Sequence, residues 1–487
     1  MINLTVFKLE PIFPEIFLAI SMLITLMIGV FKKNSEKIIS YLCVIILIIT
    51  FGSILAHNIT EKEIILNGFY TLDSFEKFSK MLLVLSTIMI IIIYNSNQIN
   101  KRFNFEFPIL IVFSLLGMMI MISANDFITL YLGFELQSLC LYVLASYDKD
   151  NDISSEAGIK YFILGALASA ILLFGISLIY GFSGTTNFSL FKYDYLTIES
   201  NFPIPLGLLI GLIMVIIGLA FKISASPFHM WTPDVYQGAP NIVTAFFSAV
   251  PKAASILLLT KLLFDPFNRG WINQWQQIII LISSLSMIVG AIGALNQTDF
   301  KRLLAYSSIG HVGYILMGLS TGNKTGVDAL LLYLVVYVIT SLGVFNLILN
   351  ISKLKNIEIN DLKGFSKKYP FASFGLAALL LSMAGIPPFA GFFTKFYIFK
   401  SVIEVNLYFL AILGIITSVI STYYYLKIIK IMYFDDIIEN SQVELICSKT
   451  SKIFFIASVI INMFFMGIID KSYLLINAAS KSFFHGN

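Results

Sequence analysis

The stretch "GLAFKISASPFHMWTPDVYQGAP", residues 218–240, begins within an apolar run and then contains residues that are costly in hydrocarbon. Lys222 follows at least a dozen nearly uninterrupted apolar residues, and Pro227, His229 and Asp234 come before the apolar run resumes. Proline removes a backbone donor and clashes with the preceding helical turn, and a charge at the centre of a membrane helix costs about 2.5–3.5 kcal/mol on insertion scales. The stretch therefore predicts a membrane helix that is broken where a functional group is needed.

The composition of the 487-residue chain indicates the class of protein. Its residues are 58% hydrophobic and 12% charged, with a mean hydropathy of +0.87, whereas soluble domains are about 25% charged. Apolar runs of about 18 or more residues, each able to cross a core of roughly 30 Å as a helix, recur along the chain. We therefore predict an all-α polytopic membrane protein, in contact with lipids, with about fourteen transmembrane helices. They are expected near 11–31, 38–57, 78–97, 107–124, 125–146, 158–182, 206–226, 241–263, 274–295, 301–319, 328–351, 370–400, 405–433 and 452–470.

The sequence offers no motif for a bound cofactor or a nucleic acid. Cys43, Cys140 and Cys447 are far apart and form no C-x-x-C pair, which argues against an iron–sulfur or zinc site. The stretch "GLSTGNKT" at 318–325 lacks the spacing of a phosphate loop. The first residues, "MINLTVFKLE", show no removable signal. We expect no cofactor or metal in this chain and, at a net charge of +4, no nucleic-acid partner.

The distribution of basic residues predicts the orientation of the chain. If the amino terminus lies outside, the loops after odd-numbered spans lie inside, among them 32–37, Lys101–Arg102, Lys301–Arg302 and 352–368. These loops and their helix ends hold about 18 Lys and Arg residues, against about 11 on the opposite side. Because inner loops carry the basic excess in membrane proteins, we predict that both termini lie on the outer side.

A second proline break occurs in "SMAGIPPFAGFFTKFYIFK", residues 382–400, at Pro387. It lies 160 residues after Pro227, and each break falls in the fourth span of a set of five. Since five is odd, consecutive five-helix units run in opposite directions, as in transporters built from inverted repeats. The alternative is that both prolines only kink their helices. The expected parts are an N-terminal three-helix segment (1–105), two five-helix antiporter-like repeats (106–263 and 272–433) and a C-terminal loop with the last helix (434–487).

Five ionisable side chains are expected deep within predicted spans: Glu135, Lys222, Lys252, His311 and Lys395. Burial disfavours the charged forms of lysine and glutamate, so a Glu–Lys pair that forms and breaks can load and release a proton. Histidine titrates near neutral pH and can relay a proton between its two nitrogens. These residues therefore predict a route for protons.

Structural explanations of the same residues remain open. Glu135 can be a static partner in an ion pair between helices, and His311 can be a packing residue bonded to hydroxyls of the neighbouring "YSS". Lys222 can cap carbonyls freed by the break. His229 and Asp234 can cap the broken helix or line its mouth.

Glu156 and Lys160 lie one helical turn apart where the sixth span begins. At this spacing they predict an ion pair at the start of a helix. A role in linking a conformational change to Glu135 is the alternative.

Five stretches together resemble one family. They are "FELQSLCLYVLAS" around Glu135, "FKISASPFHMWTPDVYQGAP" around Lys222, "KAA" at Lys252, "KRLLAYSSIGHVGY" around His311 and "GIPPFAGFFTKFYIF" around Lys395. Over roughly 105–435 the chain is similar to the antiporter-like subunits of proton-pumping NADH:quinone oxidoreductase, respiratory complex I. Within that family it resembles subunit N, called subunit 2 in mitochondria.

The resemblance implies a translocase subunit, beside neighbouring antiporter-like and small membrane-arm subunits, that passes protons along a hydrated axis when quinone reduction elsewhere in the complex drives it. NADH, FMN, iron–sulfur clusters and ubiquinone would belong to those partners. By the family pattern Glu135 would pair with Lys222, and Lys252 with His311 would lead to Lys395 at the exit. The full-length amino terminus suits a bacterial cytoplasmic membrane or a mitochondrial inner membrane of the plant or protist type. The rival interpretations are a subunit of a multi-subunit Na+/H+ antiporter and a scaffold that moves no ion.

Overall fold

The computed structural model describes most of the chain. The described residues are 10–57, 59, 62–96, 104–191, 205–267, 269–352, 358–436 and 444–484. Lys101 and Arg102, which entered the prediction of orientation, lie outside them.

Ten helices in the described part are long and apolar enough to cross a membrane. They are α1 (Phe13–Phe31), α2 (Glu36–Ala56), α3 (Ser74–Ser96), α4 (Glu106–Ser123), α5 (Phe127–Ala145), α6 (Asp152–Ser183), α10 (Asn241–Phe264), α11 (Ile272–Leu295), α13 (Lys324–Asn350) and α17 (Tyr408–Phe434). Two shorter apolar helices are α8 (Leu206–Lys222) and α15 (Pro370–Ala384). These helices confirm the prediction of a helical polytopic membrane protein.

The remaining helices are shorter or more polar. They are α9 (Trp231–Gly238), α12 (Phe300–Leu319), α14 (Phe365–Lys368), α16 (Ala390–Glu404), α18 (Lys449–Met463) and α19 (Ile469–Phe484). The span expected at 452–470 is too long, because α18 ends at Met463 and a 3-10 turn with Gly467 follows. The sequence analysis did not predict α19.

Short elements connect the helices. Strands β1 (Glu63–Ile65) and β2 (Tyr70–Leu72) form one antiparallel pair, and β3 (Ile351–Ser352) and β4 (Glu444–Leu445) form another. Single 3-10 turns lie at Glu10–Ile12, Leu66–Gly68, Arg269–Trp271, Ile359–Leu362 and Phe465–Gly467.

Side-chain caps define where several helices begin. Asp126 accepts a hydrogen bond from the backbone of Ile128 at the start of α5, and Asp299 accepts one from Arg302 at the start of α12. Such caps satisfy backbone donors that have no partner within the helix.

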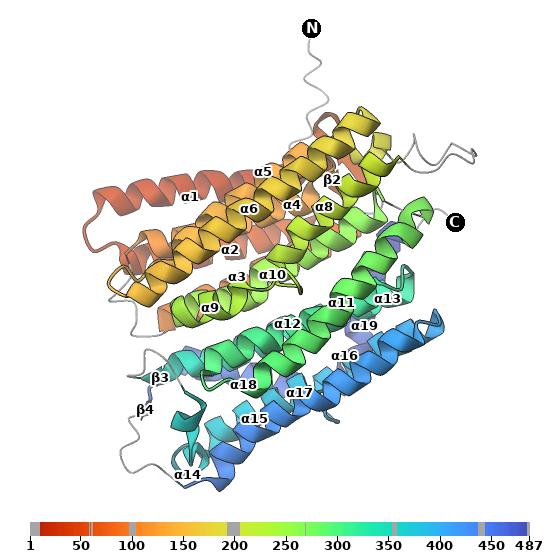
Figure 1. Cartoon of the computed structure of the whole chain (residues 1–487). Coiled ribbons are helices and arrows are strands. Elements are labelled where there is room, and N and C mark those ends of the chain that lie inside the picture. The colour runs from red at the N-terminus through yellow and green to blue at the C-terminus, as the bar shows by residue number, and fades with distance from the viewer. Residues whose placement is uncertain are drawn as a thin grey trace.

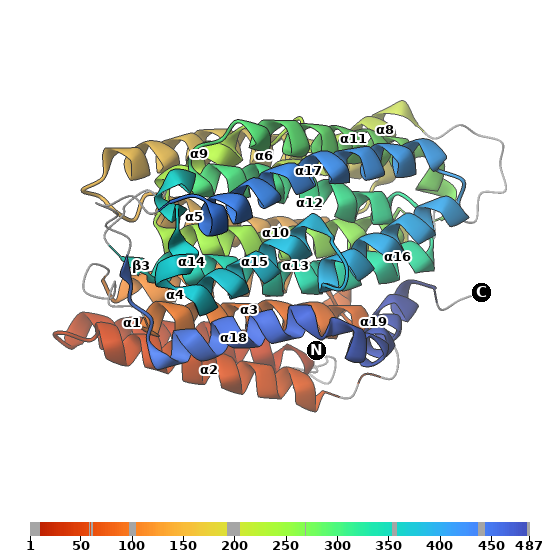
Figure 2. The same cartoon turned by 90° about the horizontal axis from the view of Figure 1, so that it is seen from below.

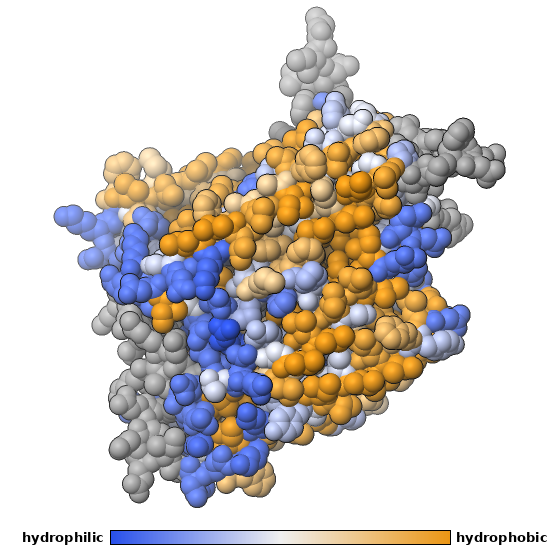
Figure 3. All heavy atoms as spheres, in the orientation of Figure 1, coloured by the Kyte–Doolittle hydropathy of each residue, from blue (hydrophilic) through white to orange (hydrophobic). Residues whose placement is uncertain are grey.

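The helices run side by side, with α4 to α10 in one half and α11 to α17 in the other (Figures 1 and 2). An apolar segment of 18 residues in α10 is entirely buried, and the corresponding segment of α13 is 89% buried, so these two helices form the core. Apolar side chains cover most of the visible face, with hydrophilic ones gathered toward the helix ends (Figure 3). This surface suits a bilayer.

Each half contains one pair of closely packed helices and one broken helix. A Cβ atom at Gly117 of α4 would lie 2.6 Å from the backbone nitrogen of Gln137 in α5, and one at Gly290 of α11 would lie 2.4 Å from that of Gly310 in α12. Glycine allows this close approach, as in other membrane helix pairs. The first break separates α8 from α9 and the second separates α15 from α16, as predicted.

Candidate functional site

Lys222 is the last residue of α8, and its side chain is only 3% exposed. Its Nζ lies 5.2, 5.1 and 5.3 Å from the ring centroids of Phe134, Tyr142 and Tyr161. Among the described residues, this nitrogen has no hydrogen-bond partner. Three aromatic faces therefore surround the ammonium and attract it by cation–π interaction. The structure does not place Lys222 as a cap on freed carbonyls.

Glu135 lies on α5, next to Phe134, and is half-buried. Its Oε1 is buried and, in the described part of the chain, has no hydrogen-bond partner. Glu135 and Lys222 are therefore not hydrogen-bonded to each other through these atoms. Further buried polar atoms without a protein partner belong to Gln137, Tyr142, Ser169, Ser224, His229, Thr232 and Tyr236. Buried polar groups of this kind bind water in native proteins, so the region around the first break has the chemistry of a hydrated site.

Lys252 connects the two halves of the molecule. It lies on α10 in the first half, and its Nζ donates a hydrogen bond to Ser308 of α12 in the second half. The Ser308 hydroxyl also accepts a 3.0 Å bond from Tyr337 of α13. The Lys252 ammonium lies 4.9 Å from the ring centroid of Tyr236. The hydroxyl of Ser308 is thus a direct polar link between the lysine and the second half.

His311, on α12, has a partner at each ring nitrogen. Nδ1 lies 2.7 Å from the hydroxyl of Tyr333, and Nε2 lies 3.1 Å from that of Tyr425. Tyr425 is in turn hydrogen-bonded to Ser307. The ring centroid of His311 lies 5.3 Å from that of Tyr337. This geometry gives both ring nitrogens a hydrogen-bond partner, as a packing histidine requires. It also suits a proton relay, because a proton can enter at one nitrogen and leave from the other.

Lys395, on α16, closes the second break. Its Nζ donates hydrogen bonds to the carbonyl of Ala384, the last residue of α15, at 2.8 Å and to Ser418 at 2.9 Å. It also lies 4.8 Å from the ring centroid of Tyr314. The capping role considered for Lys222 is therefore the one that Lys395 adopts.

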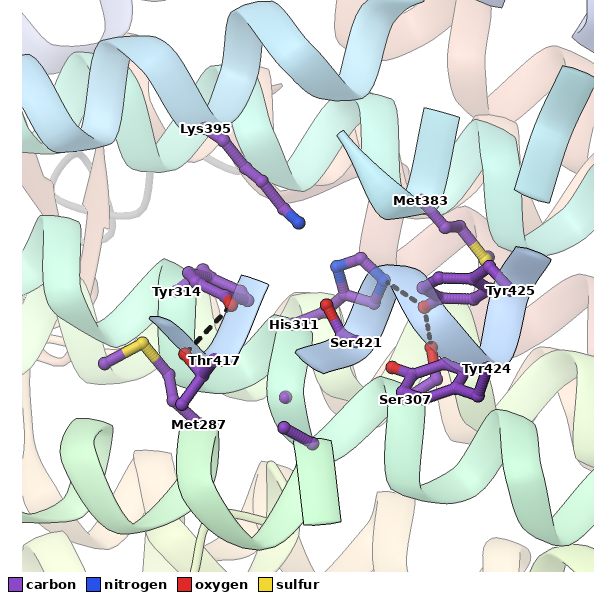
Figure 4. Close-up of a pocket in the computed structure, with 12 residues that line it drawn as sticks. Met287, Ser307, His311, Tyr314, Met383, Lys395, Thr417, Ser421, Tyr424 and Tyr425 are labelled. Atoms are coloured by element: carbon purple, nitrogen blue, oxygen red, sulfur yellow. Dashed lines mark hydrogen bonds between the residues drawn. The ribbon is translucent and has the colours of Figure 1, made fainter. Parts of the chain in front are cut away.

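A small cavity of about 10 Å³ separates Lys395 from His311, and the lysine nitrogen points into it between His311 and Tyr314 (Figure 4). Hydroxyls of Ser307 and Thr417 also line it. A second small cavity, of about 20 Å³, is lined by His311, Tyr337, Ser382 and Thr394, among others. Each cavity has room for about one water molecule, which can extend the polar contacts of His311.

Gly385 allows Lys395 to reach the break. It ends α15 with a φ of +84°, and a Cβ atom there would lie 2.7 Å from Cδ of Lys395. Only glycine adopts this backbone conformation without strain and leaves this space open.

The residues at the start of α6 form an ion-pair network. Lys160 contacts Glu156 at 2.8 Å, which confirms the predicted pair, and also Asp234 of α9 at 2.8 Å. Arg302 of α12 contacts Asp234 at 2.7 Å. Burial raises the pKa of Asp234, but hydrogen bonds from Lys160 and Arg302 outweigh it and hold that pKa below its usual value. Asp234 therefore ties α6, α9 and α12 together and does not cap the break.

The remaining predicted residues lie at the breaks themselves. His229 is half-buried, and Pro227 and Pro387 are exposed. The proline breaks thus face outward while the lysines beside them face inward.

The sequence analysis missed a group of buried charges near the amino terminus. Glu15 of α1 pairs with Lys80 of α3 at 2.9 Å, and Glu76 of α3 pairs with Lys261 of α10. Glu15 and Lys80 lie within predicted spans, which was the available signal, but only tertiary structure could identify their partners. In the described ranges no three His, Cys, Asp or Glu residues are grouped so as to hold a metal.

Comparison with known proteins first defines a class. Residues 124–421 match the family described as NADH:quinone oxidoreductase/Mrp antiporter, TM. The fold is shared, at 18% identity, with a chain of the Mrp complex from Dietzia sp., with a TM-score of 0.82 over 98% of both chains. The protein is therefore an antiporter-like membrane subunit.

Closer relatives define the particular family. The chain is 49% identical to NADH-quinone oxidoreductase subunit N of Pelagibacter ubique, over 88% of this chain and 90% of the relative. It is 46% identical to subunit N of Rhodospirillum rubrum, over 94% of each. A chain of respiratory complex I from Thermus thermophilus matches with a TM-score of 0.80 at 27% identity, over 96% and 99% of the two chains. The chain belongs to the subunit N family of NADH-quinone oxidoreductases.

Proposed function

We propose that this chain carries protons across the membrane as part of an NADH:quinone oxidoreductase, driven by quinone reduction in partner subunits. The observation that carries the proposal is the hydrogen bond from Lys252 to Ser308, because it joins an ionisable group of the first half to a hydroxyl of the second half. NADH, FMN, iron–sulfur clusters and quinone would bind to the partners. Those partners include neighbouring antiporter-like and small membrane subunits.

Each deep ionisable group has a place in the proposed route. Glu135 and Lys222 exchange a proton in the first half, and Lys252 receives it. His311 passes it on through its tyrosine partners and the adjoining cavities. Lys395 releases it at the far side. Each step moves a proton between neighbouring donors and acceptors and requires no redox chemistry in this chain.

The proposed topology extends the ten membrane-length helices to fourteen spans. α8, α12, the broken pair α15–α16 and α18 supply the other four. The repeats then comprise 106–263 and 272–433, in inverted orientation, with the three-helix segment 1–105 before them and 434–487 after them. Both termini lie on the outer side of a bacterial cytoplasmic or mitochondrial inner membrane.

The proposal is tested with Glu135→Ala and Lys222→Ala in the assembled complex. We expect each variant to assemble and to lose most of its NADH:quinone turnover and proton pumping. Full proton stoichiometry in both variants would contradict the route and favour a scaffold.

A subunit of a multi-subunit Na+/H+ antiporter is the second candidate, because the Mrp complex shares the fold. Purification of the chain with its native partners separates the two candidates. Recovery of quinone-site and iron–sulfur subunits supports the oxidoreductase, and recovery of small antiporter subunits alone supports the antiporter.

A further inference from the structure

Lys222 differs from the other buried lysines of this chain in its partners. Within the described ranges, the other buried lysines each donate a hydrogen bond to an oxygen atom: Lys80, Lys252, Lys261, Lys301 and Lys395. Lys222 donates none and lies instead among three rings, which we call the aromatic cage: Phe134, Tyr142 and Tyr161. All three ring centroids are within the roughly 6 Å over which cation–π attraction operates.

The chemistry of the aromatic cage suits a lysine that changes partners. A ring face attracts a cation but accepts no proton, so the cage itself cannot take the proton from the lysine. The attraction has no strict direction, unlike a hydrogen bond. Lys222 can therefore leave the cage without a donor or an acceptor losing a hydrogen bond. Glu135, which lies beside Phe134 on α5, offers the alternative contact, and its buried Oε1 is likewise without a described protein partner.

Trp231 holds the aromatic cage in place relative to the lysine. Its ring stacks on Tyr161 with centroids 4.4 Å apart and an interplanar angle of 15°. Its Nε1 donates a 2.9 Å hydrogen bond to the carbonyl of Phe221, the residue before Lys222. Trp231 is the first residue of α9, which Asp234 ties to α6 and α12. A movement of α9 would therefore act on the cage and on the backbone at the lysine together.

We propose that the aromatic cage is the second resting place of the Lys222 ammonium, in competition with Glu135, and that Trp231 is the residue that positions it. This inference rests on the proposed function, since it assigns the two positions between which the first proton-transferring lysine moves. The rings take no part in proton transfer themselves.

The test compares loss of the ring with loss of the hydroxyl in the assembled complex in proteoliposomes. Tyr161→Leu removes the ring, and we expect turnover and pumping to fall about threefold to tenfold. Tyr161→Phe keeps the ring and should remain within about twofold of the parent. At Trp231, too, the Leu variant should lose more turnover and pumping than the Phe variant. Equal losses in the Phe and Leu variants would overturn the proposal.

Tyr94→Leu is the matched control. Tyr94 is also a buried tyrosine that packs against another aromatic side chain, Phe107, with ring centroids 5.0 Å apart and planes tilted by 32°, and it lies on α3, outside the cage. It should lower thermal stability as Tyr161→Leu does, without the loss of turnover. If Tyr94→Leu lowers turnover as much, the effect is general packing and the cage is excluded.

Competition for one lysine also makes the variants non-additive. In a Glu135→Gln background, Tyr161→Leu should have a clearly different fold-effect from its effect in the parent. An unchanged fold-effect would show that the two residues act independently and would overturn the proposal.

Lys222→Met separates the proposed function from the cage hypothesis. If Lys222→Met retains full turnover, the proposed function fails. If Lys222→Met is inactive and Tyr161→Leu keeps its turnover, only the cage hypothesis fails.

Discussion

The two broken helices place a lysine beside a proline break and use it in opposite ways. At the first break Lys222 lies before the proline, surrounded by rings and without a hydrogen bond among the described residues. At the second, Lys395 lies after the proline and is hydrogen-bonded to Ala384 and Ser418. The break near Lys222 is held by other groups, since Ser226 donates its backbone N–H to the Ser286 hydroxyl at 2.8 Å. The lysine of the first half therefore has no hydrogen bond among the described residues, whereas the lysine of the second half caps a carbonyl of its broken helix.

This difference has an energetic consequence. A hydrogen bond to a charged group contributes about 1.5–3 kcal/mol, and Lys395 must give up two of them to move. Lys222 gives up three cation–π contacts of about 0.5–2 kcal/mol each and Lys395 gives up one, but the loss of such a contact leaves no hydrogen-bonding group unpaired. The comparison predicts that Lys222 moves more readily than Lys395.

The largest expected effect comes from replacing each lysine with methionine. Lys222→Met and Lys395→Met both remove a proposed proton carrier, so turnover should fall at least about tenfold, or about 1.4 kcal/mol in the activation barrier. Only Lys395→Met leaves the Ala384 carbonyl without its donor, which costs about 1–3 kcal/mol. Thermal unfolding of the complex should therefore shift in Lys395→Met and hardly at all in Lys222→Met. Equal shifts would break the comparison.

A smaller effect is expected where the second break makes room for its lysine. Gly385→Ala places a methyl group 2.7 Å from Cδ of Lys395 and forces a residue with a Cβ atom into a φ of +84°. Strain of this kind costs about 1–3 kcal/mol, and displacement of Lys395 should lower turnover severalfold. Gly184→Ala is the control, since its φ is +72° but a Cβ atom there meets nothing within 4 Å. It should lose stability and keep its turnover. If both variants keep full turnover, the position of Lys395 is not critical.

The features that could be predicted from the sequence are those that depend on a residue and its neighbours along the chain. Hydropathy located the helices, and proline located both breaks, because each property acts locally. The partners of the deep charges could not be predicted in this way. The ring contacts of Lys222 involve residues 61–88 positions away, and the capping contact of Lys395 depends on the fold of the break. Asp234 was assigned to its neighbouring break, although its partners come from two other helices.

An intermediate effect is expected from Ser308→Ala. The hydroxyl of Ser308 accepts hydrogen bonds from Lys252 and Tyr337, so its removal interrupts the link between the halves. A lost hydrogen bond of about 0.5–1.5 kcal/mol should lower turnover about two- to tenfold. Ser255→Ala is the control, because within the described residues this buried hydroxyl on α10 donates its hydrogen bond to its own helix, at the carbonyl of Pro251. Full turnover in Ser308→Ala would show that protons do not pass between the halves through this hydroxyl. It would contradict a single route that includes Lys252 and Ser308.

The smallest effect is expected from Asp234→Asn, which tests whether the two halves are held together at their helix ends. Asp234 is 36% exposed, and partly exposed ion pairs contribute about 0.2–1 kcal/mol. The variant should lose that much stability and a modest part of its turnover. Asp436→Asn is the control, because Asp436 pairs with Lys367 on the surface and its side chain is 97% exposed. It should change neither quantity.

The pH dependence of this loss identifies its cause. The pKa of Asp234 is lowered in the folded protein, so its ion pairs stabilise the fold above the ordinary aspartate pKa, and the contribution is lost only as the pH falls through the lowered value. The difference in thermal stability between parent and Asp234→Asn should therefore stay constant between about pH 8 and pH 5. A difference that shrinks within that range would mean that another titrating group causes it. In that case the stability lost in Asp234→Asn would not come from the ion pairs that link α9 to α6 of the first half and α12 of the second.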